Sequence, residues 1–102
     1  MKMNMNDMLK QAQKIQSQMA KIQDELASET VEGNAGGGMV RAVFNGQSEF
    51  ISIHIEKEVV SPEDVEMLED LVSAAIGDGL RKAKDLASSR MGPVAGGLGG
   101  MF

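Results

Sequence analysis

The stretch that decides the fold is MNDMLKQAQKIQSQMAKIQDEL, residues Met5 to Leu26. Apolar residues recur in it at alternating spacings of three and four, which places them along one side of a helix with a period of about 3.5 residues. The residues of this apolar seam are Met5, Met8, Ala12, Ile15, Met19, Ile22 and Leu26. Because no Pro or Gly interrupts residues 1–32, the sequence predicts one helix over about residues 6–28. The seam must be covered, either by the rest of the chain or by a second copy.

After this helix the pattern changes to the period of two that is typical of β-strands. Alternation over residues 39–45 and 50–55, with a shorter segment at 30–33, predicts a meander of two or three antiparallel strands. The glycine run at 36–38 is expected to form a turn, and Asn45-Gly46 predicts a two-residue hairpin. In the last strand Ile51, Ile53 and Ile55 are expected on one face, with Phe50, Ser52 and His54 on the other. Such a small sheet needs a helix or a second sheet over its apolar face.

A second long helix is predicted to follow. Ser61-Pro62 reads as an N-cap and first helical residue, and the helix is expected to end near Ser89. Its apolar stripe comprises Val65, Leu68, Val72, Ala75, Gly79, Ala83 and Leu86. Gly79 lies in this stripe and is expected to allow close packing, whereas Gly77 lies opposite, and a break in the helix there stays an alternative. Gly92-Pro93 is expected to end the helix, and residues 92–102 are predicted to be a Gly-rich, disordered tail.

The composition argues against several classes of protein. The 102 residues include one His and no Cys or Tyr, so no catalytic constellation or thiolate metal site is expected. The nine Met are mostly at core spacing, and the acids near residues 63–70 suit the first turns of a helix, so neither group predicts a metal or cofactor. The glycine run lacks the Lys-Ser or Lys-Thr of a P-loop. No apolar run is long enough to span a membrane, and the N-terminal residues are not expected to act as a secretory signal.

The charge is unevenly distributed. The net charge is −5, yet residues 1–23 carry four Lys against one Asp, and residues 71–102 carry four cations against two Asp. Residues 24–70 carry twelve acids against two cations. If the two long helices lie antiparallel across the sheet, the basic regions merge into one basic tip, which would bind nucleic-acid phosphates without reading bases. The alternative is that these cations are solvated or simply complement a helix C-terminus. The candidate DNA-binding residues are Lys10, Lys14, Lys21, Arg81, Lys82, Lys84 and Arg90.

Three segments together resemble the YbaB/EbfC family of bacterial nucleoid-associated proteins. They are residues 5–16, the glycine run followed by MVRAV at 39–43, and VSPEDVEMLEDLVSAA at 60–75. The resemblance covers residues 1–91, which we interpret as the DNA-binding domain. It implies an α+β fold of a long helix, a three-stranded antiparallel sheet and a long helix, in an intertwined homodimer with projecting helices. It also implies loose sequence preference and roles in nucleoid organisation, gene regulation and DNA protection. The Gly77 and Gly79 positions depart from the family, which more often has Asn and Ala there.

The leading hypothesis is therefore a homodimeric, non-enzymatic DNA-binding protein of the bacterial cytoplasm and nucleoid, with no cofactor, membrane association or small-molecule substrate. One alternative is an adaptor whose Met/Ile seam holds a partner helix. A second alternative is an N-terminal helix that lies on a membrane surface.

Overall fold

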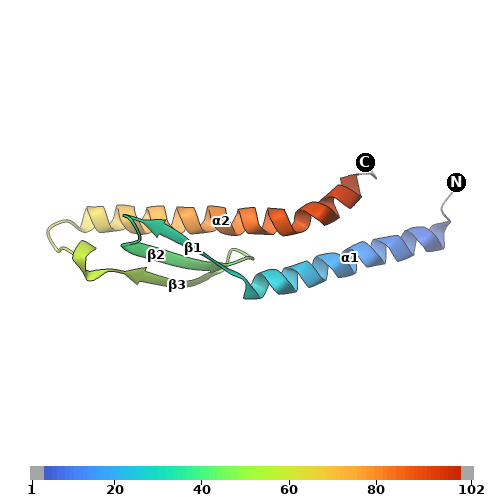
Figure 1. The fold of residues 1–102 in the computed structure, drawn as a ribbon, viewed down its shortest axis with the longest axis horizontal. Coiled ribbons are helices and arrows are strands. Elements are labelled where there is room, and N and C mark those ends of the chain that lie inside the picture. Colours follow the sequence, from blue (N-terminus) through green and yellow to red (C-terminus); the bar gives the residue numbers. More distant parts are fainter. Residues whose placement is uncertain (1–3, 100–102) are drawn as a thin grey trace.

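The computed structural model describes residues 4–99, with side chains through Val94. The element order is α1 (Met5–Ser28), β1 (Thr30–Ala35), β2 (Val40–Asn45), β3 (Phe50–Ile55), a short 3₁₀ helix η1 (Lys57–Val59) and α2 (Val65–Gly99). The predicted α-β-β-β-α fold is thus confirmed. The molecule is elongated, with extents of 71 × 23 × 16 Å, because α1 projects from one end of the sheet instead of folding back over it (Figure 1).

The three strands form one antiparallel sheet in the order β1-β2-β3. Val31 of β1 pairs with Phe44 of β2, and Ile55 of β3 pairs with Val40. The face of β2 that carries Val40, Ala42 and Phe44 is buried, as its alternation predicts. The glycine run forms the β1–β2 turn, where Gly36, Gly37 and Gly38 all have positive φ. Side chains with a Cβ rarely adopt three such conformations in succession, so glycine suits this turn.

Helix α2 covers the buried face of β1 and β2 at very short range (Figure 1). Gly33 of β1 lies directly under the helix, where a Cβ would come within 2.2 Å of the Ala75 carbonyl oxygen and of the Gly79 backbone nitrogen. At Gly79 a Cβ would approach the Phe44 ring to 2.6 Å. The helix is continuous through this region, so the predicted role of Gly79 in close packing is supported and the break at Gly77 is absent.

The turn between β2 and β3 is wider than the predicted two-residue hairpin. Asn45 and Glu49 close it through a backbone hydrogen bond of 3.0 Å, and Ser48 takes a positive φ of 64°. The cause is the buried Asn45 side chain, whose Oδ1 accepts the backbone N–H groups of Gln47 and Glu49. Next to this turn, the pairing of β2 with β3 contains a bulge between Val43 and Phe44. Because of this bulge, Phe50 packs edge-on against Phe44 on the apolar face of the sheet, with ring centroids 5.7 Å apart. The prediction that Phe50 lies on the opposite face was therefore wrong.

This turn anchors α1 to the sheet. The Gly46 N–H donates to the Leu26 carbonyl oxygen at 2.8 Å, and the Asn45 amide donates to the Ala27 carbonyl oxygen at 3.2 Å. Leu26 is buried against the turn, and a Cβ at Gly46 would come within 2.6 Å of its side chain. The Asn-Gly pair therefore does not form a tight hairpin. It provides hydrogen-bond donors for the free carbonyl groups at the C-terminus of α1.

Both ends of α2 differ from the prediction. Asp64, not Ser61, caps the N-terminus, and its Oδ1 accepts the Met67 N–H at 3.1 Å. Residues 61–64 form a turn instead, a conformation in which Pro at the second position is equally favoured. At the other end α2 continues through Pro93 to Gly99, past its predicted end near Ser89. The helix bends there (Figure 1), as expected where proline lacks an N–H, and the buried Val94 gives this extension an apolar contact. Residues 100–102 of the predicted tail lie outside the described residues.

Candidate nucleic-acid interface

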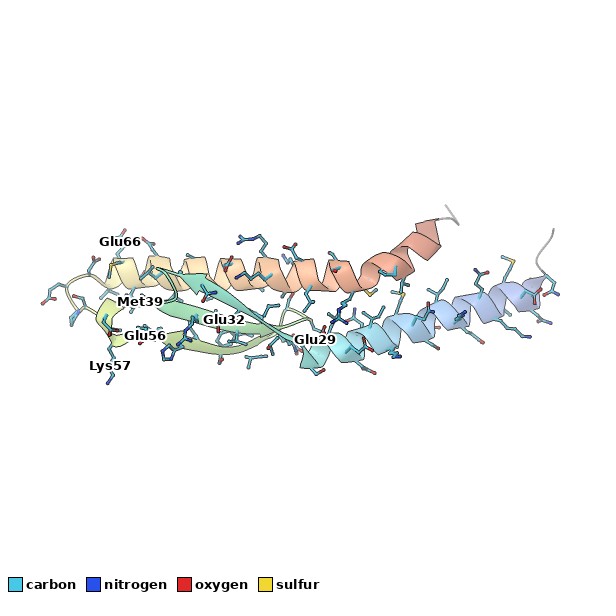
Figure 2. The ribbon with its side chains drawn as sticks, in the orientation of Figure 1. Glu29, Glu32, Met39, Glu56, Lys57 and Glu66 are labelled. Carbon is cyan, nitrogen blue, oxygen red and sulfur yellow. The ribbon has the colours of Figure 1, made fainter. Side chains whose placement is uncertain are left out.

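Charge is separated along the long axis of the molecule. Glu56 and Glu66 lie at the end of the sheet farthest from α1, whereas Glu29 lies at the junction where α1 enters the sheet (Figure 2). Beyond this junction, residues 5–23 of α1 contain three Lys and a single acid, Asp7. We call these residues the basic arm. A molecule with net charge −5 therefore carries a locally positive segment at one end.

The lysines of the basic arm are free to meet an anion. Lys10, Lys14 and Lys21 are exposed, and none of them pairs with a carboxylate within residues 4–94. Lys10 and Lys14 border one shallow hollow on α1, and Lys21 borders another where α1 meets the end of α2. These three positions fall within about 40° on a helix at ~100° per residue, so they share one side of the arm.

The cations of α2 are mostly paired with acids. The Asp78 carboxylate binds Arg81 and also Lys82, whose Nζ lies 3.0 Å from Oδ2. Arg90 reaches across to the C-terminal end of α1, where it pairs with Glu29, the residue just after the helix, and lies 3.9 Å from Glu25. Lys84 is exposed, without a carboxylate partner in the described part of the chain.

The predicted single basic tip is therefore wrong. Helix α1 does not lie over the sheet but projects away from one end of it (Figure 1), whereas Lys82 lies beside β1, where its Nζ donates to the Glu32 carbonyl oxygen. Lys10 is separated from the end of α1 at Ser28 by roughly 27 Å, at ~1.5 Å per residue. The structure brings Lys21 close to Arg90 but leaves the other predicted residues distributed along the molecule.

Asp78 links α2 to the edge strand β1. Its Oδ2 accepts the Asn34 N–H at 3.0 Å. This hydrogen bond, followed by those from Lys82 and by the charges of Lys82 and Arg81, lowers the pKa of Asp78 below its ordinary value of 3.8, although partial burial opposes the shift.

The lowered pKa gives a pH-dependent contribution to stability. A carboxyl whose pKa is depressed by folding stabilises the native state above its unfolded pKa, and this contribution is lost as the pH falls through the folded pKa. We expect Asp78→Asn to reduce the free energy of unfolding at pH 7, and we expect the difference from wild type to shrink as the pH falls below 3.8. Urea unfolding of both proteins at neutral and acidic pH measures this. A difference that stays constant across the range would contradict the assigned role.

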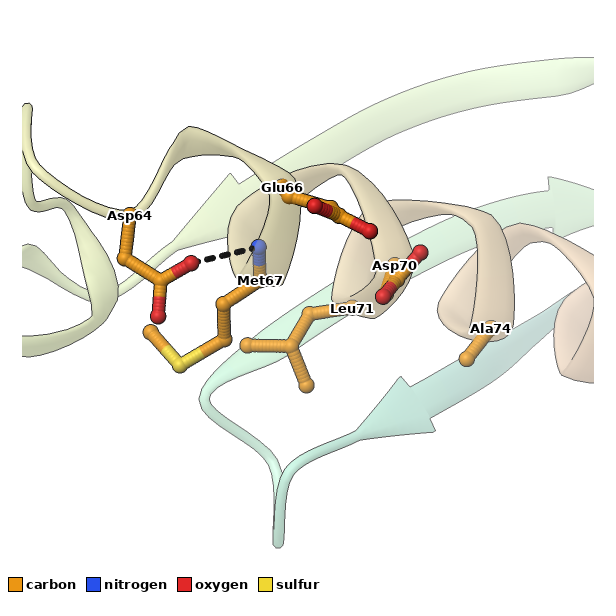
Figure 3. Close-up of a pocket in the computed structure, with 6 residues that line it drawn as sticks. All are labelled: Asp64, Glu66, Met67, Asp70, Leu71 and Ala74. Atoms are coloured by element: carbon orange, nitrogen blue, oxygen red, sulfur yellow. Dashed lines mark hydrogen bonds between the residues drawn. The ribbon is translucent and has the colours of Figure 1, made fainter.

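Other candidate sites have less support. Asp64, Glu66 and Asp70 rim a shallow hollow lined by Met67, Leu71 and Ala74 (Figure 3). No group of three or more potential metal-ligating residues converges within the described residues. His54 is exposed beside Glu56, with Nε2 3.0 Å from Oε1. Across residues 4–99, no helix combines the length and apolarity needed to cross a bilayer.

The sequence prediction missed Asp78, although its spacing of three and four residues from Arg81 and Lys82 is the usual spacing of helical ion pairs. It also missed the partners of Arg90, because Glu25 and Glu29 are some sixty residues away and no local pattern marks them. The close approach of Gly33 to α2 was missed as well, although a glycine inside a strand can signal a close backbone approach. Gly46 was predicted only as part of a hairpin, and its contact with Leu26 was missed.

The fold defines a small α-β-β-β-α protein in which one helix covers the sheet and the other projects as a basic arm. The sequence matches the profile of the YbaB/EbfC DNA-binding family over residues 1–98, and the chain belongs to this family. This is a family of DNA-binding proteins and not of enzymes.

Related proteins support the assignment. A nucleoid-associated protein of Chloroflexus aurantiacus is 52% identical over 98% of this chain and 100% of its own length. Nucleoid-associated proteins of Syntrophobacter fumaroxidans (51%, covering 88% of this chain and 82% of the relative) and Bacillus thuringiensis (53%, 97% and 94%) are similar. The crystal structure of the uncharacterized protein HP0035 from Helicobacter pylori shares the fold, with a TM-score of 0.74 at 20% identity over 82% of this chain and 88% of that one.

Proposed function

We propose that this protein binds double-stranded DNA mainly through its phosphates, with loose sequence preference, as a homodimer in the bacterial cytoplasm and nucleoid. Binding would alter the conformation of the DNA and so contribute to nucleoid organisation, gene regulation and DNA protection. The single observation that carries the proposal is the basic arm, an exposed helix whose three lysines have no carboxylate partner within residues 4–94. The family membership and the nucleoid-associated relatives support it.

The seven candidate cations are not equivalent in this proposal. Lys10, Lys14, Lys21 and Lys84 are available to phosphates directly, and each phosphate that they neutralise releases counterions. Arg81, Lys82 and Arg90 would first have to exchange a carboxylate for a phosphate, so they contribute less. We therefore assign the primary contacts to the basic arm.

The sheet supports the homodimer. Helix α2 covers β1 and β2, which leaves β3 with Phe50, Ile51 and Ile53 between 38% and 56% exposed. A strand with an open edge and an apolar face pairs readily with a second strand or sheet. We propose that a second copy covers this surface, so that two basic arms extend from one joined core.

A substitution on β3 tests the dimer. We expect Ile51→Lys to give a monomer, because a charge would replace an apolar side chain that is already 51% exposed in the single chain and so costs the isolated fold little. Ser52→Lys, on the neighbouring exposed position, is the matched control and should stay dimeric. Size-exclusion chromatography with light scattering gives the mass. Equal masses for both variants would contradict the proposed interface.

The binding itself is tested with a labelled duplex of arbitrary sequence. Fluorescence anisotropy at rising salt should show an association constant that falls linearly on a log–log plot, with a second unrelated duplex giving a similar constant. Absence of binding at low salt, or binding that does not weaken with salt, would contradict the proposal.

One observation favours the adaptor alternative. The outer part of the apolar seam is uncovered, with Met5 76% and Met8 55% exposed, so a partner helix has a surface to pack against. The same titration separates the two functions, because an adaptor does not require salt-dependent DNA binding.

A further inference from the structure

Two cations and a backbone N–H converge on one acid beside β1. Arg81 binds Oδ1 of Asp78, and Lys82 Nζ lies 3.0 Å from Oδ2. The Asn34 N–H donates to the same Oδ2 at 3.0 Å, and Lys82 also donates to the Glu32 carbonyl oxygen at 3.0 Å. A guanidinium, an ammonium and a backbone N–H are the groups with which proteins bind phosphate oxygens.

We infer that this cluster is an anion-binding site occupied by the protein's own carboxylate, and that Asp78 competes with DNA phosphate for Arg81 and Lys82. The inference rests on the proposed function and deepens it. It predicts that Asp78 limits the affinity for DNA, and that Arg81 and Lys82 contribute little to DNA binding while Asp78 is charged.

The exposures of the three side chains make such a competition possible. Arg81 is 67% exposed and Lys82 is 44% exposed, so both can meet a ligand that approaches from solvent. Ion pairs this exposed stabilise proteins little, and an incoming phosphate can therefore replace the carboxylate as their partner.

Asp78 itself cannot move away easily. Its side chain is only 20% exposed, and the hydrogen bond from Asn34 ties it to β1. Its lowered pKa keeps it ionised at neutral pH. Its negative charge thus stays beneath the two cations and repels a phosphate that binds them.

Asp78→Asn is a conservative test, because the asparagine Oδ1 can still accept the Asn34 N–H while the charge is removed. Asp85→Asn is the matched control. It makes the same charge change seven residues further along α2, on nearly the same side of the helix, and Asp85 has no ion pair among the residues that the structure describes. Thermal unfolding followed by circular dichroism confirms that each variant is folded.

Fluorescence anisotropy with one labelled duplex at fixed low salt compares these proteins. We expect Asp78→Asn to raise the affinity at least about threefold, and Asp85→Asn to raise it less. The magnitude of the salt slope should increase by up to ~1.8 per protomer in Asp78→Asn, since two further cations meet phosphates. Adding Arg81→Gln and Lys82→Gln to Asp78→Asn should abolish the gain, whereas the same pair in the wild-type background should change the affinity little.

Two results would overturn the inference. One is that Asp78→Asn and Asp85→Asn raise the affinity for DNA equally, which would mean that the gain comes only from the change in net charge. The other is a gain that persists without Arg81 and Lys82. In both cases salt-dependent binding by the wild type would leave the proposed function intact. Absence of wild-type binding would overturn the proposed function and the inference together.

Discussion

Gly33→Ala is expected to destabilise the fold by at least about 3 kcal/mol, which for a domain of this size lowers the melting temperature by ~10 °C or more. The added Cβ would lie 2.2 Å from the Ala75 carbonyl oxygen and from the Gly79 nitrogen. Both are backbone atoms of α2, so no side-chain rotation relieves the clash and the whole helix must move off the sheet. Thermal unfolding followed by circular dichroism measures the effect.

Gly77→Ala is the matched control for this prediction. Apart from its neighbours in the helix backbone, no atom lies within 4 Å of a Cβ at Gly77, and its backbone is helical, so alanine should stabilise α2 by up to about 1 kcal/mol. Opposite signs at two glycines would identify the helix–sheet contact as the cause. A Gly33→Ala protein as stable as wild type would show that α2 does not approach β1 this closely.

The second large effect concerns the basic arm. We expect the triple variant Lys10→Gln, Lys14→Gln and Lys21→Gln to bind DNA roughly 10- to 100-fold more weakly at low salt, because each protomer loses three cationic side chains that contact phosphates. The three side chains are exposed and project from a surface helix, so the fold should be unaffected. Fluorescence anisotropy with a labelled duplex gives the affinities.

Two controls separate charge from other causes. Replacing the same three lysines with arginine keeps the charge and should keep the affinity. Lys57→Gln removes a cation at the opposite, acidic end, where Figure 2 shows Lys57 beside Glu56, and should change binding little. A loss with arginine similar to the loss with glutamine would indicate a role of the lysines other than phosphate binding.

The element types were predictable because each depends on local pattern. Three local patterns each predict the conformation of the residues that form them. They are the apolar seam of α1, the alternation of β2 and the three glycines of the β1–β2 turn. The errors arose where a residue type suits two structures. Asn45-Gly46 favours a tight hairpin, but here Asn45 hydrogen-bonds a wider turn and Gly46 contacts Leu26. Pro62 suits both a helix start and the turn that it occupies.

The candidate site was less predictable than the fold. The lysines of α1 could be placed together because they lie on one helix. The placement of Arg90 next to Glu29 depends on how α1 leaves the sheet, and a helical wheel contains no information on that. For the same reason the merged basic tip could not be tested from the sequence. Of the ion pairs at the candidate site, only those of Asp78 with Arg81 and Lys82 could have been predicted from short sequence spacing.

The most direct measurement is the salt dependence of DNA binding by wild type and the triple glutamine variant, recorded side by side. If the lysines of the basic arm meet phosphates, the log–log slope should become shallower by up to ~2.7 per protomer, at ~0.9 for each lost contact. Identical slopes for the two proteins, with both still bound to DNA, would mean that the basic arm is not where the phosphates lie.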